Sequence, residues 1–232
     1  EFEYSETVRW GTLGPSVSAG NGLYVAYNGS HTHVMNTSTL PSSTPVEDAV
    51  YWAWRPIKTN IDGLGARKNH AMSSLGNGKV LMYGGVDDNN KILNDAYIFA
   101  LSTDAKTGEE IVNWTQTADG PSARAGHAMS SLGNGKILMY GGGSDNGHAY
   151  IFSLSTNTKT GEEIVNWTQT VDGPSARVGH ALSSLGNDKV VLYGGFNANI
   201  HFALNDAYIF SLFTNEENGE EKGAWKRVQD GP

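Results

Sequence analysis

The chain contains no cysteine, which removes several kinds of chemistry. It can form no disulfide, offer no thiolate ligand to a metal and supply no cysteine nucleophile. Positive charge is also scarce, because 16 Lys and Arg residues face 24 Asp and Glu residues and give a net charge of -8. No dense stripe of basic residues stands out. We therefore expect neither a nucleic-acid groove nor a patch for anionic membranes.

Long apolar runs are missing as well. None approaches the roughly 18 residues that a membrane-spanning helix needs, and Glu1-Phe2-Glu3-Tyr4 does not resemble the start of a signal peptide. We expect a soluble chain without membrane insertion. The sequence does not decide between the cytoplasm and secretion.

Glycine, in contrast, is abundant: 29 of the 232 residues are Gly, nearly double the usual share of about 7%. Such an excess predicts many tight turns. The length allows one large domain or two small ones and is enough to bury a substantial core.

Internal repetition is the strongest signal in the sequence. Three blocks align without gaps: GARKNHAMSSLGNGKVLMYGG at 65–85, SARAGHAMSSLGNGKILMYGG at 122–142 and SARVGHALSSLGNDKVVLYGG at 175–195. Each is followed by a segment such as NDAYIFALS and then by one such as EIVNWTQT, and each unit closes with Asp-Gly-Pro. A period of about 50 residues indicates a repeat architecture.

A fourth, diverged copy lies upstream. GLYVAYNG at 22–29, THVMNTS at 32–38 and VYWAWRP at 50–56 stand where the three segments of the other units stand, without the Arg and His of the later copies. Before it, TVRWGTLGP at 7–15 resembles the chain's last segment. We therefore predict a single domain with a leading outer strand in residues 1–15 and approximate repeats at 16–64, 65–121, 122–174 and 175–232.

Each repeat predicts four short strands, because its apolar runs are separated by turn residues and show no helical period. Gly76-Asn77-Gly78 and Gly133-Asn134-Gly135 supply residues that tolerate positive φ in a hairpin, and Asp188 replaces the second glycine in the last copy. One four-stranded antiparallel sheet per repeat is the pattern of a β-propeller blade. The predicted fold class is all-β.

The repeated residues resemble those of kelch repeats. The resemblance rests on a double glycine after an apolar strand, an aromatic residue in the next strand and a tryptophan after it: Gly84-Gly85, Gly141-Gly142, Gly194-Gly195; Tyr97, Tyr150, Tyr208; Trp114, Trp167, Trp225. It covers nearly the whole chain. It implies a propeller of kelch blades, but kelch propellers serve many functions.

The histidines His70, His127 and His180 recur at one point of each unit. Since radial symmetry separates equivalent points of different blades, we interpret each as a partly buried residue bonded to a carbonyl of its own blade. We predict no metal site and no cofactor. Asp95 and Asp206, with His148 at the matching place, are interpreted as acceptors for a turn at the start of a strand.

Arg67, Arg124 and Arg177 follow the connections between blades, where propeller loops gather on one face. Two interpretations stay open. Each arginine could tie its own loop to a carboxylate or carbonyl of the adjoining blade, or the arginines could form a ring whose forked donors bind carboxylates. In kelch domains the corresponding face commonly binds partners.

Segments that are not repeated are better places to look for specific binding. The loop FNANIHFALN at 196–205 carries apolar groups, which are costly in a loop unless something covers them. We predict that its Phe196, Asn199, His201 and Phe202 contribute to a binding surface.

No catalytic motif is present, and the copper centre of galactose oxidase, a kelch-like propeller enzyme, needs a cysteine that this chain lacks. The first functional hypothesis is therefore a non-catalytic module that binds a protein or peptide through the loop face. The alternatives are a multivalent, lectin-like carbohydrate-binding propeller, with equivalent sites between blades, and the scaffold part of a larger kelch-containing enzyme.

Closure of the ring is the remaining question, because kelch propellers usually have about six or seven blades and this sequence supplies four. Three solutions are open: a small closed ring, two chains that complete one ring as a homo-oligomer, or a part of a larger propeller whose other blades are missing. The unpaired segment at 7–15 favours the last.

Overall fold

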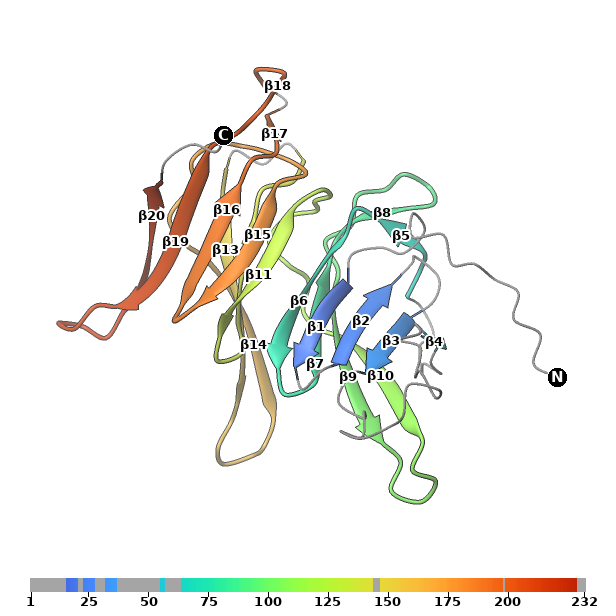
Figure 1. Cartoon of the computed structure of the whole chain (residues 1–232). Coiled ribbons are helices and arrows are strands. Elements are labelled where there is room, and N and C mark those ends of the chain that lie inside the picture. Colours follow the sequence, from blue (N-terminus) through green and yellow to red (C-terminus); the bar gives the residue numbers. More distant parts are fainter. Residues whose placement is uncertain are drawn as a thin grey trace, which may run out of the picture.

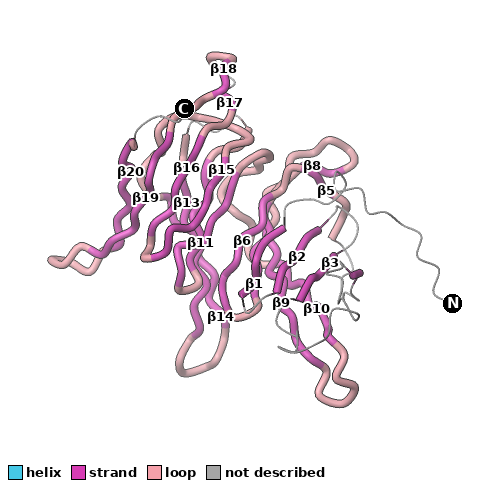
Figure 2. Tube along the Cα trace, viewed as in Figure 1, coloured by secondary structure: helices cyan, strands magenta, loops and turns pink. Residues whose placement is uncertain are grey.

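The described part of the chain folds into four four-stranded antiparallel sheets and two smaller two-stranded ones, and it contains no helix (Figures 1 and 2). The computed structural model describes the backbone of residues 16–20, 23–27, 32–36 and 55–56, and residues 64–143, 147–197 and 199–228 in full. The predicted leading strand at 7–15 lies outside these ranges.

Each sheet is a meander of four strands drawn from one sequence repeat. The strands of the four sheets, in chain order, are β1 (Ser16–Gly20), β2 (Leu23–Tyr27), β3 (Thr32–Asn36) and β4 (Arg55–Pro56); β6 (Ala71–Gly76), β7 (Lys79–Tyr83), β9 (Ala96–Thr103) and β10 (Glu110–Gln116); β11 (Ala128–Gly133), β12 (Lys136–Tyr140), β13 (Ala149–Thr156) and β14 (Glu163–Gln169); β15 (Ala181–Gly186), β16 (Lys189–Tyr193), β19 (Ala207–Thr214) and β20 (Glu221–Arg227). The all-β, kelch-type fold class is confirmed.

The first hairpin of each later sheet has the predicted turn chemistry. Asn77 and Gly78, between β6 and β7, have φ of 52° and 72°, and Gly76 pairs with Lys79 across a bulge. In the fourth sheet Asp188 adopts the same conformation with φ of 57°. Two residues with positive φ match the twist of the flanking strands, which fixes the register of the hairpin.

The strands that begin the sheets, β1, β6, β11 and β15, lie in succession along the inside of the molecule, each in contact with the next. The sheets therefore radiate from a common line, as propeller blades do. Figure 1 shows them as an open arc rather than a closed ring.

Apolar residues from neighbouring sheets form the core. One buried cluster joins β6, β7 and β9 to β11, β12 and β13, and a second joins β11, β12 and β13 to β16 and β19. Trp167 and Trp225 pack against these two clusters. Adjacent blades therefore stabilise each other by burial of apolar surface.

Two further two-stranded sheets each include a strand that follows a double glycine. Strands β5 (Arg67–Lys68) and β8 (Val86–Asp87) pair in the second unit, and β17 (Phe196–Asn197) and β18 (Phe202–Ala203) pair in the fourth. Figure 1 shows β17 and β18 projecting beyond the end of the fourth sheet. The described residues include no helix with the length and apolarity that crossing a lipid bilayer requires.

Candidate functional site

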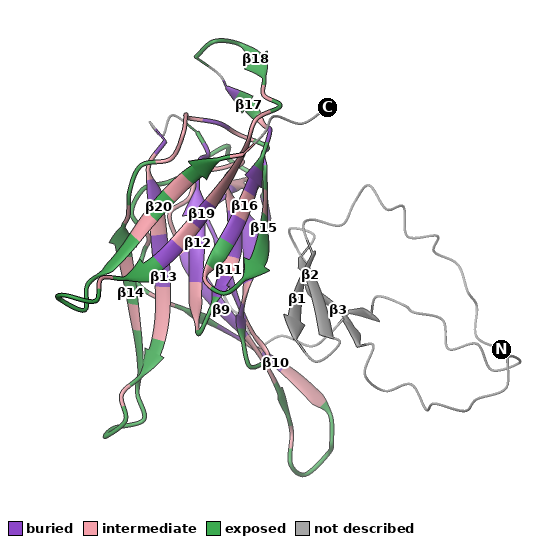
Figure 3. Cartoon of the chain, turned by 60° about the vertical axis from the view of Figure 1, so that its left-hand side comes forward, coloured by how far each residue is buried: buried purple, intermediate pink, exposed green. Residues whose placement is uncertain are grey.

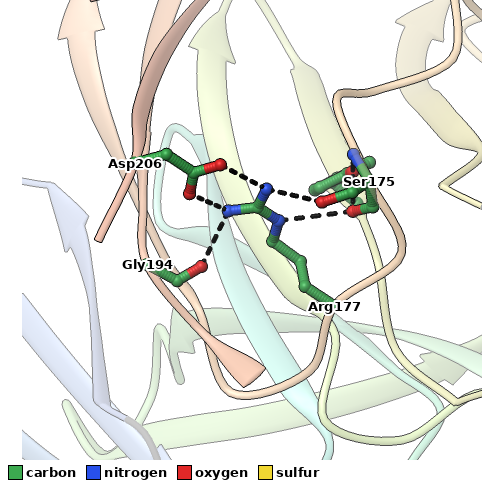
Figure 4. Close-up of polar contacts among 5 residues, drawn as sticks. Ser175, Arg177, Gly194 and Asp206 are labelled. Atoms are coloured by element: carbon green, nitrogen blue, oxygen red, sulfur yellow. Dashed lines mark hydrogen bonds and ion pairs between the residues drawn. The ribbon is translucent and has the colours of Figure 1, made fainter. Parts of the chain in front are cut away.

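The three repeated arginines are buried at the loop end of their sheets. Arg177 has a fully buried side chain, and its guanidinium forms a two-point ion pair with Asp206, at 2.6 Å from Nη1 to Oδ1 and 3.0 Å from Nη2 to Oδ2 (Figure 4). Nη1 also donates to the Gly194 carbonyl at 2.9 Å, and Nη2 donates to Ser175 Oγ at 2.8 Å. The arginine thus ties the start of its repeat to the start of β19 in the same unit.

The second unit repeats this arrangement, while the third departs from it. Arg67 donates to Asp95 at 2.6 and 2.9 Å and to the Gly84 carbonyl at 3.1 Å. Arg124 donates to the Gly141 carbonyl at 3.0 Å and to Ser122 Oγ at 2.7 Å. The third unit has His148 where the other two have aspartate, so the carboxylate at that place is absent.

Asp95 and Asp206 therefore have a different role from the one that sequence reasoning gave them. We assigned both to a turn, whereas their carboxylates accept hydrogen bonds from arginine. The Arg177 guanidinium lowers the pKa of Asp206, which keeps this aspartate ionised near neutral pH. His148 instead lies 2.8 Å from Asp172 and lowers the pKa of that exposed carboxyl.

These contacts bear on the two interpretations of the arginines. The hydrogen bonds described above lie within the arginine's own unit, but the Tyr83 hydroxyl of the second unit also interacts with Arg124 of the third, and Tyr140 of the third interacts with Arg177 of the fourth. Each arginine also lies over an aromatic ring of its own unit, at 5.4 Å for Arg67 over Tyr97 and 5.1 Å for Arg124 over Tyr150. The geometry favours an internal role, with partners in the arginine's own blade and in the adjoining one. A ring that binds carboxylates stays a prediction.

The repeated histidines are contacts between blades. The His127 ring packs edge-on against Tyr83 of the preceding unit, with ring centres 5.5 Å apart, and His180 packs likewise against Tyr140 at 5.3 Å. Our expectation of a bond within the histidine's own blade is wrong for these two, because the double glycine of the preceding blade leaves room for the ring. A Cβ on Gly141 would lie 2.6 Å from His180 Cε1.

Burial keeps these histidines neutral. Desolvation, with a smaller contribution from the neighbouring arginine, lowers the pKa of His127 to about 3 and that of His70 and His180 to about 4. Across the described part of the chain, no three His, Asp or Glu residues gather as metal ligands would.

The hairpin β17–β18 displays the apolar loop that the sequence singled out. Ile200 and Phe202 are 54% and 68% exposed, Phe196 is 41% exposed, and the Phe196 ring lies 6.5 Å from the ring of His201. Asn197 is buried, and its side-chain oxygen accepts a hydrogen bond from the Asn199 amide at 2.9 Å. The structure thus places the four predicted loop residues on one hairpin, with Phe196 at its base, and leaves the arginines inside the blades.

Sequence reasoning missed a second exposed apolar surface. The side of the fourth sheet that faces away from the third unit includes Leu185 and Tyr193, which are 52% and 45% exposed. Figure 3 shows exposed positions along β15 and β16. The equivalent leucines and tyrosines are buried in the second and third units, so the exposure of this surface could have been predicted only from the lack of a following repeat in these residues.

Comparison with known proteins places these features in a family. A family model described as the KLHDC2/KLHL20/DRC7 Kelch-repeats domain matches residues 17–229. Adagio protein 3 of Arabidopsis thaliana is 28% identical over 187 residues, which are 77% of this chain and 28% of that protein. The F-box/kelch-repeat protein At1g51550 of the same plant is 25% identical over 174 residues, or 73% of this chain and 34% of that protein.

A solved structure gives a further likeness of fold. The chain in the cryo-EM structure of RAG with one melted and one unmelted RSS has a TM-score of 0.58 and 16% identity, covering 97% of this chain and 70% of that one. This chain spans only about a quarter to a third of the length of the curated relatives named above. The match over residues 17–229, together with the kelch-type sheets, shows that the chain belongs to the KLHDC2/KLHL20/DRC7 Kelch-repeats domain family.

Proposed function

We propose that the chain is a non-catalytic interaction module that binds a protein or peptide through its loop face. The observation that carries the proposal is the hairpin β17–β18, which holds Ile200 and Phe202 largely in solvent. Apolar side chains gathered at a projecting tip are typical of surfaces that a partner covers. Membership of a kelch family supports the proposal, as does the kinship with an F-box/kelch-repeat protein.

The hairpin has the properties of a binding element on a rigid scaffold. Strand β17 continues from the double glycine Gly194-Gly195, and Val178 and Phe196 exchange two backbone hydrogen bonds of 2.9 Å that tie the base of the hairpin to the body. The buried Asn197 side chain fixes the start of the tip. A loop held at its base presents its apolar tip with little conformational entropy left to lose on binding.

The test is selection of ligands from a displayed peptide library with the immobilised chain, followed by affinity measurements on variants. The double variant Ile200→Ser, Phe202→Ser should weaken selected ligands at least about tenfold, because truncating central apolar anchors typically costs that much. Ile164→Ser, Phe213→Ser is the matched control, since these residues are equally apolar, each 49% exposed, and lie on β14 and β19 outside the loop. Equal loss in both double variants, or none in the first, contradicts the proposal.

A lectin-like function is the second candidate, and equivalent grooves between blades favour it. One groove is lined by residues 115–117 and Glu163, and the next is lined by residues 168–170 and Glu221, the matching positions one unit later. Hydroxyl, amide and carboxylate groups in such a groove could hydrogen-bond a sugar. On a glycan array this candidate requires binding that Gln116→Ala and Gln169→Ala each reduce and that Phe202→Ser leaves unchanged.

A further inference from the structure

The outer face of the fourth sheet repeats, residue for residue, two faces that are covered in this structure. In the second and third sheets the leucine near the end of the first strand and the tyrosine at the end of the second strand are buried: Leu75 and Tyr83, then Leu132 and Tyr140. The exposed fractions of Leu132 and Tyr140 are 2% and 0%, against 52% and 45% for Leu185 and Tyr193. The same residue types thus face a neighbouring blade twice and solvent once.

The covered faces show what a neighbouring blade supplies to the tyrosine. The Tyr140 hydroxyl donates to the Ser175 carbonyl of the next repeat at 2.5 Å, and its ring packs against His180 and Trp225 with centres 5.3 and 5.2 Å away. Tyr83 has the same three partners one unit earlier, namely the Ser122 carbonyl at 2.8 Å, His127 and Trp167. Each tyrosine therefore contacts a serine carbonyl, a histidine and a tryptophan of the following repeat.

Backbone and charge complete the pattern. Gly85 donates to the carbonyl of Arg124 at 2.9 Å and Gly142 to that of Arg177 at 3.0 Å, so each double glycine binds the arginine backbone of the following repeat. At the rim, Lys79 pairs with Glu163 and Lys136 with Glu221. The fourth sheet has Gly195 and Lys189 at the matching places.

The space beside the fourth unit's double glycine has the conformation that a neighbouring blade fills in the earlier units. A Cβ added to Gly141 would meet the Arg177 carbonyl and the His180 ring, both at 2.6 Å, whereas among the described residues one added to Gly194 would meet only the Leu204 carbonyl, at 3.0 Å. The three glycines Gly84, Gly141 and Gly194 share a left-handed φ between 62° and 72°. The fourth unit therefore holds the docking conformation without the arginine carbonyl and histidine that fill it elsewhere.

We infer that this face, formed by β15, β16 and β19 and centred on Tyr193, is a docking surface for a further kelch blade of the type of residues 122–174. The blade supplies a Ser-Ala-Arg start whose serine carbonyl accepts a hydrogen bond from the Tyr193 hydroxyl. It also supplies a histidine and a tryptophan that pack against the Tyr193 ring, and a glutamate that pairs with Lys189. Stacking on such a blade buries the apolar face as in the earlier units.

A second copy of these 232 residues does not offer that partner. The faces of its second, third and fourth sheets that would have to dock are packed already: Val80, Met82 and Phe99 are buried in the second unit, and Ile137 and Val190 are buried at the next two junctions. Its first repeat lacks the Arg and His signature. The occupant is therefore a kelch blade from outside these residues.

The test adds such a blade to the intact chain. A copy of residues 122–174 placed after Pro232 keeps the Gly-Pro-Ser junction of the natural repeats, and nitration with tetranitromethane followed by mass spectrometry reads each tyrosine. In the 232-residue chain Tyr193 should react readily and Tyr140 should not. In the extended chain nitration of Tyr193 should slow at least about tenfold, because its ring becomes buried.

A matched control carries alanine in the appended copy at the place of Trp167, and it should restore much of the Tyr193 reactivity. An unchanged Tyr193 rate in the extended chain overturns the inference. A Tyr193 already protected in the 232-residue chain, with twice the monomer mass in light scattering, also overturns it, since a second copy would then cover the face.

A variant pair in the unextended chain keeps the inference testable if the appended copy fails to fold. Leu185→Asp should leave the melting temperature within a few degrees of the parent, because this leucine faces solvent, whereas Leu132→Asp should abolish cooperative unfolding. If Leu185→Asp is as damaging as Leu132→Asp, the face is packed in solution and the inference fails.

Discussion

The third and fourth sheets are near copies in sequence, yet one has both faces covered and the other has one. β12 and β16 carry the same kind of residues, but four of five positions are buried in β12 and only two in β16. The difference comes from the neighbour, because a kelch unit buries its second face only when another unit stacks on it. Identical side chains can therefore stabilise the fold in one unit and form a binding surface in the next.

The largest effect should separate the two tyrosines of this comparison. Tyr140→Ala removes a fully buried ring and its hydrogen bond to Ser175, and it should cost about 3–5 kcal/mol in the free energy of unfolding. Tyr193→Ala removes a half-exposed ring and should cost about 1 kcal/mol or less. Urea unfolding of both variants measures the difference, and equal losses would show that the two faces are alike in solution.

Asp206→Asn should be nearly as damaging as Tyr140→Ala. Removing the carboxylate leaves the Arg177 guanidinium buried without its counter-charge, which should cost about 3 kcal/mol. His148→Ala, at the matching place in the third unit, changes an exposed contact with Asp172 and should cost under about 1 kcal/mol. The melting temperatures of the two variants should differ by several degrees. Similar melting temperatures would show that the Arg177–Asp206 ion pair does not stabilise the fold.

Acid should destabilise the junctions between sheets by a smaller amount for each histidine. The pKa of His127 is about 3 and that of His180 about 4 in the folded chain, both below the ordinary histidine value of 6.5, so the unfolded chain binds more protons as pH falls below about 6.5. Each histidine should lower the free energy of unfolding by about 1–2 kcal/mol between pH 7.5 and pH 5.

His127→Gln should flatten this pH dependence without removing it. Asp206 does not contribute in that window, since its pKa is lowered and its loss of charge begins only at more acidic pH. Urea titrations at several pH values measure the slope. A slope unchanged in His127→Gln would mean that His127 gains a proton without unfolding.

The smallest change in the free energy of unfolding should come from the lysine–glutamate ion pairs at the rim of the junctions. Lys136 pairs with Glu221 at a partly exposed position, so Lys136→Ala should cost about 0.2–1 kcal/mol, with a smaller cost in high salt. Lys189→Ala, the same change on the open face, should cost nothing measurable. If the two costs are equal, the rim pair adds nothing to the junction.

Much of the fold could be predicted from the sequence, because repetition reports the same information several times. Asn77 and Gly78 predict a hairpin turn, and the double glycines, tyrosines and tryptophans indicate kelch repeats. The orientation of single side chains could not be read in this way. Asp206 lies 29 positions from Arg177, and only the folded sheet brings the two together.

Only part of the exposed apolar surface could be predicted from the sequence. Phe202 stood out because an apolar residue in an unrepeated loop has no structural role to explain it. Tyr193 and Leu185 did not, because their repeats suggested a core. Whether a repeated residue is buried depends on the neighbouring unit, which the residue itself does not encode.

The central claim is that the outer face of the fourth sheet is an unoccupied copy of the covered junctions. Hydroxyl-radical footprinting of the 232-residue chain tests it most directly, since one experiment reads side-chain accessibility at equivalent positions. The account predicts strong oxidation of Leu185 and Tyr193 and protection of Leu132 and Tyr140, in proportion to their exposure. Equal protection of all four residues would contradict it.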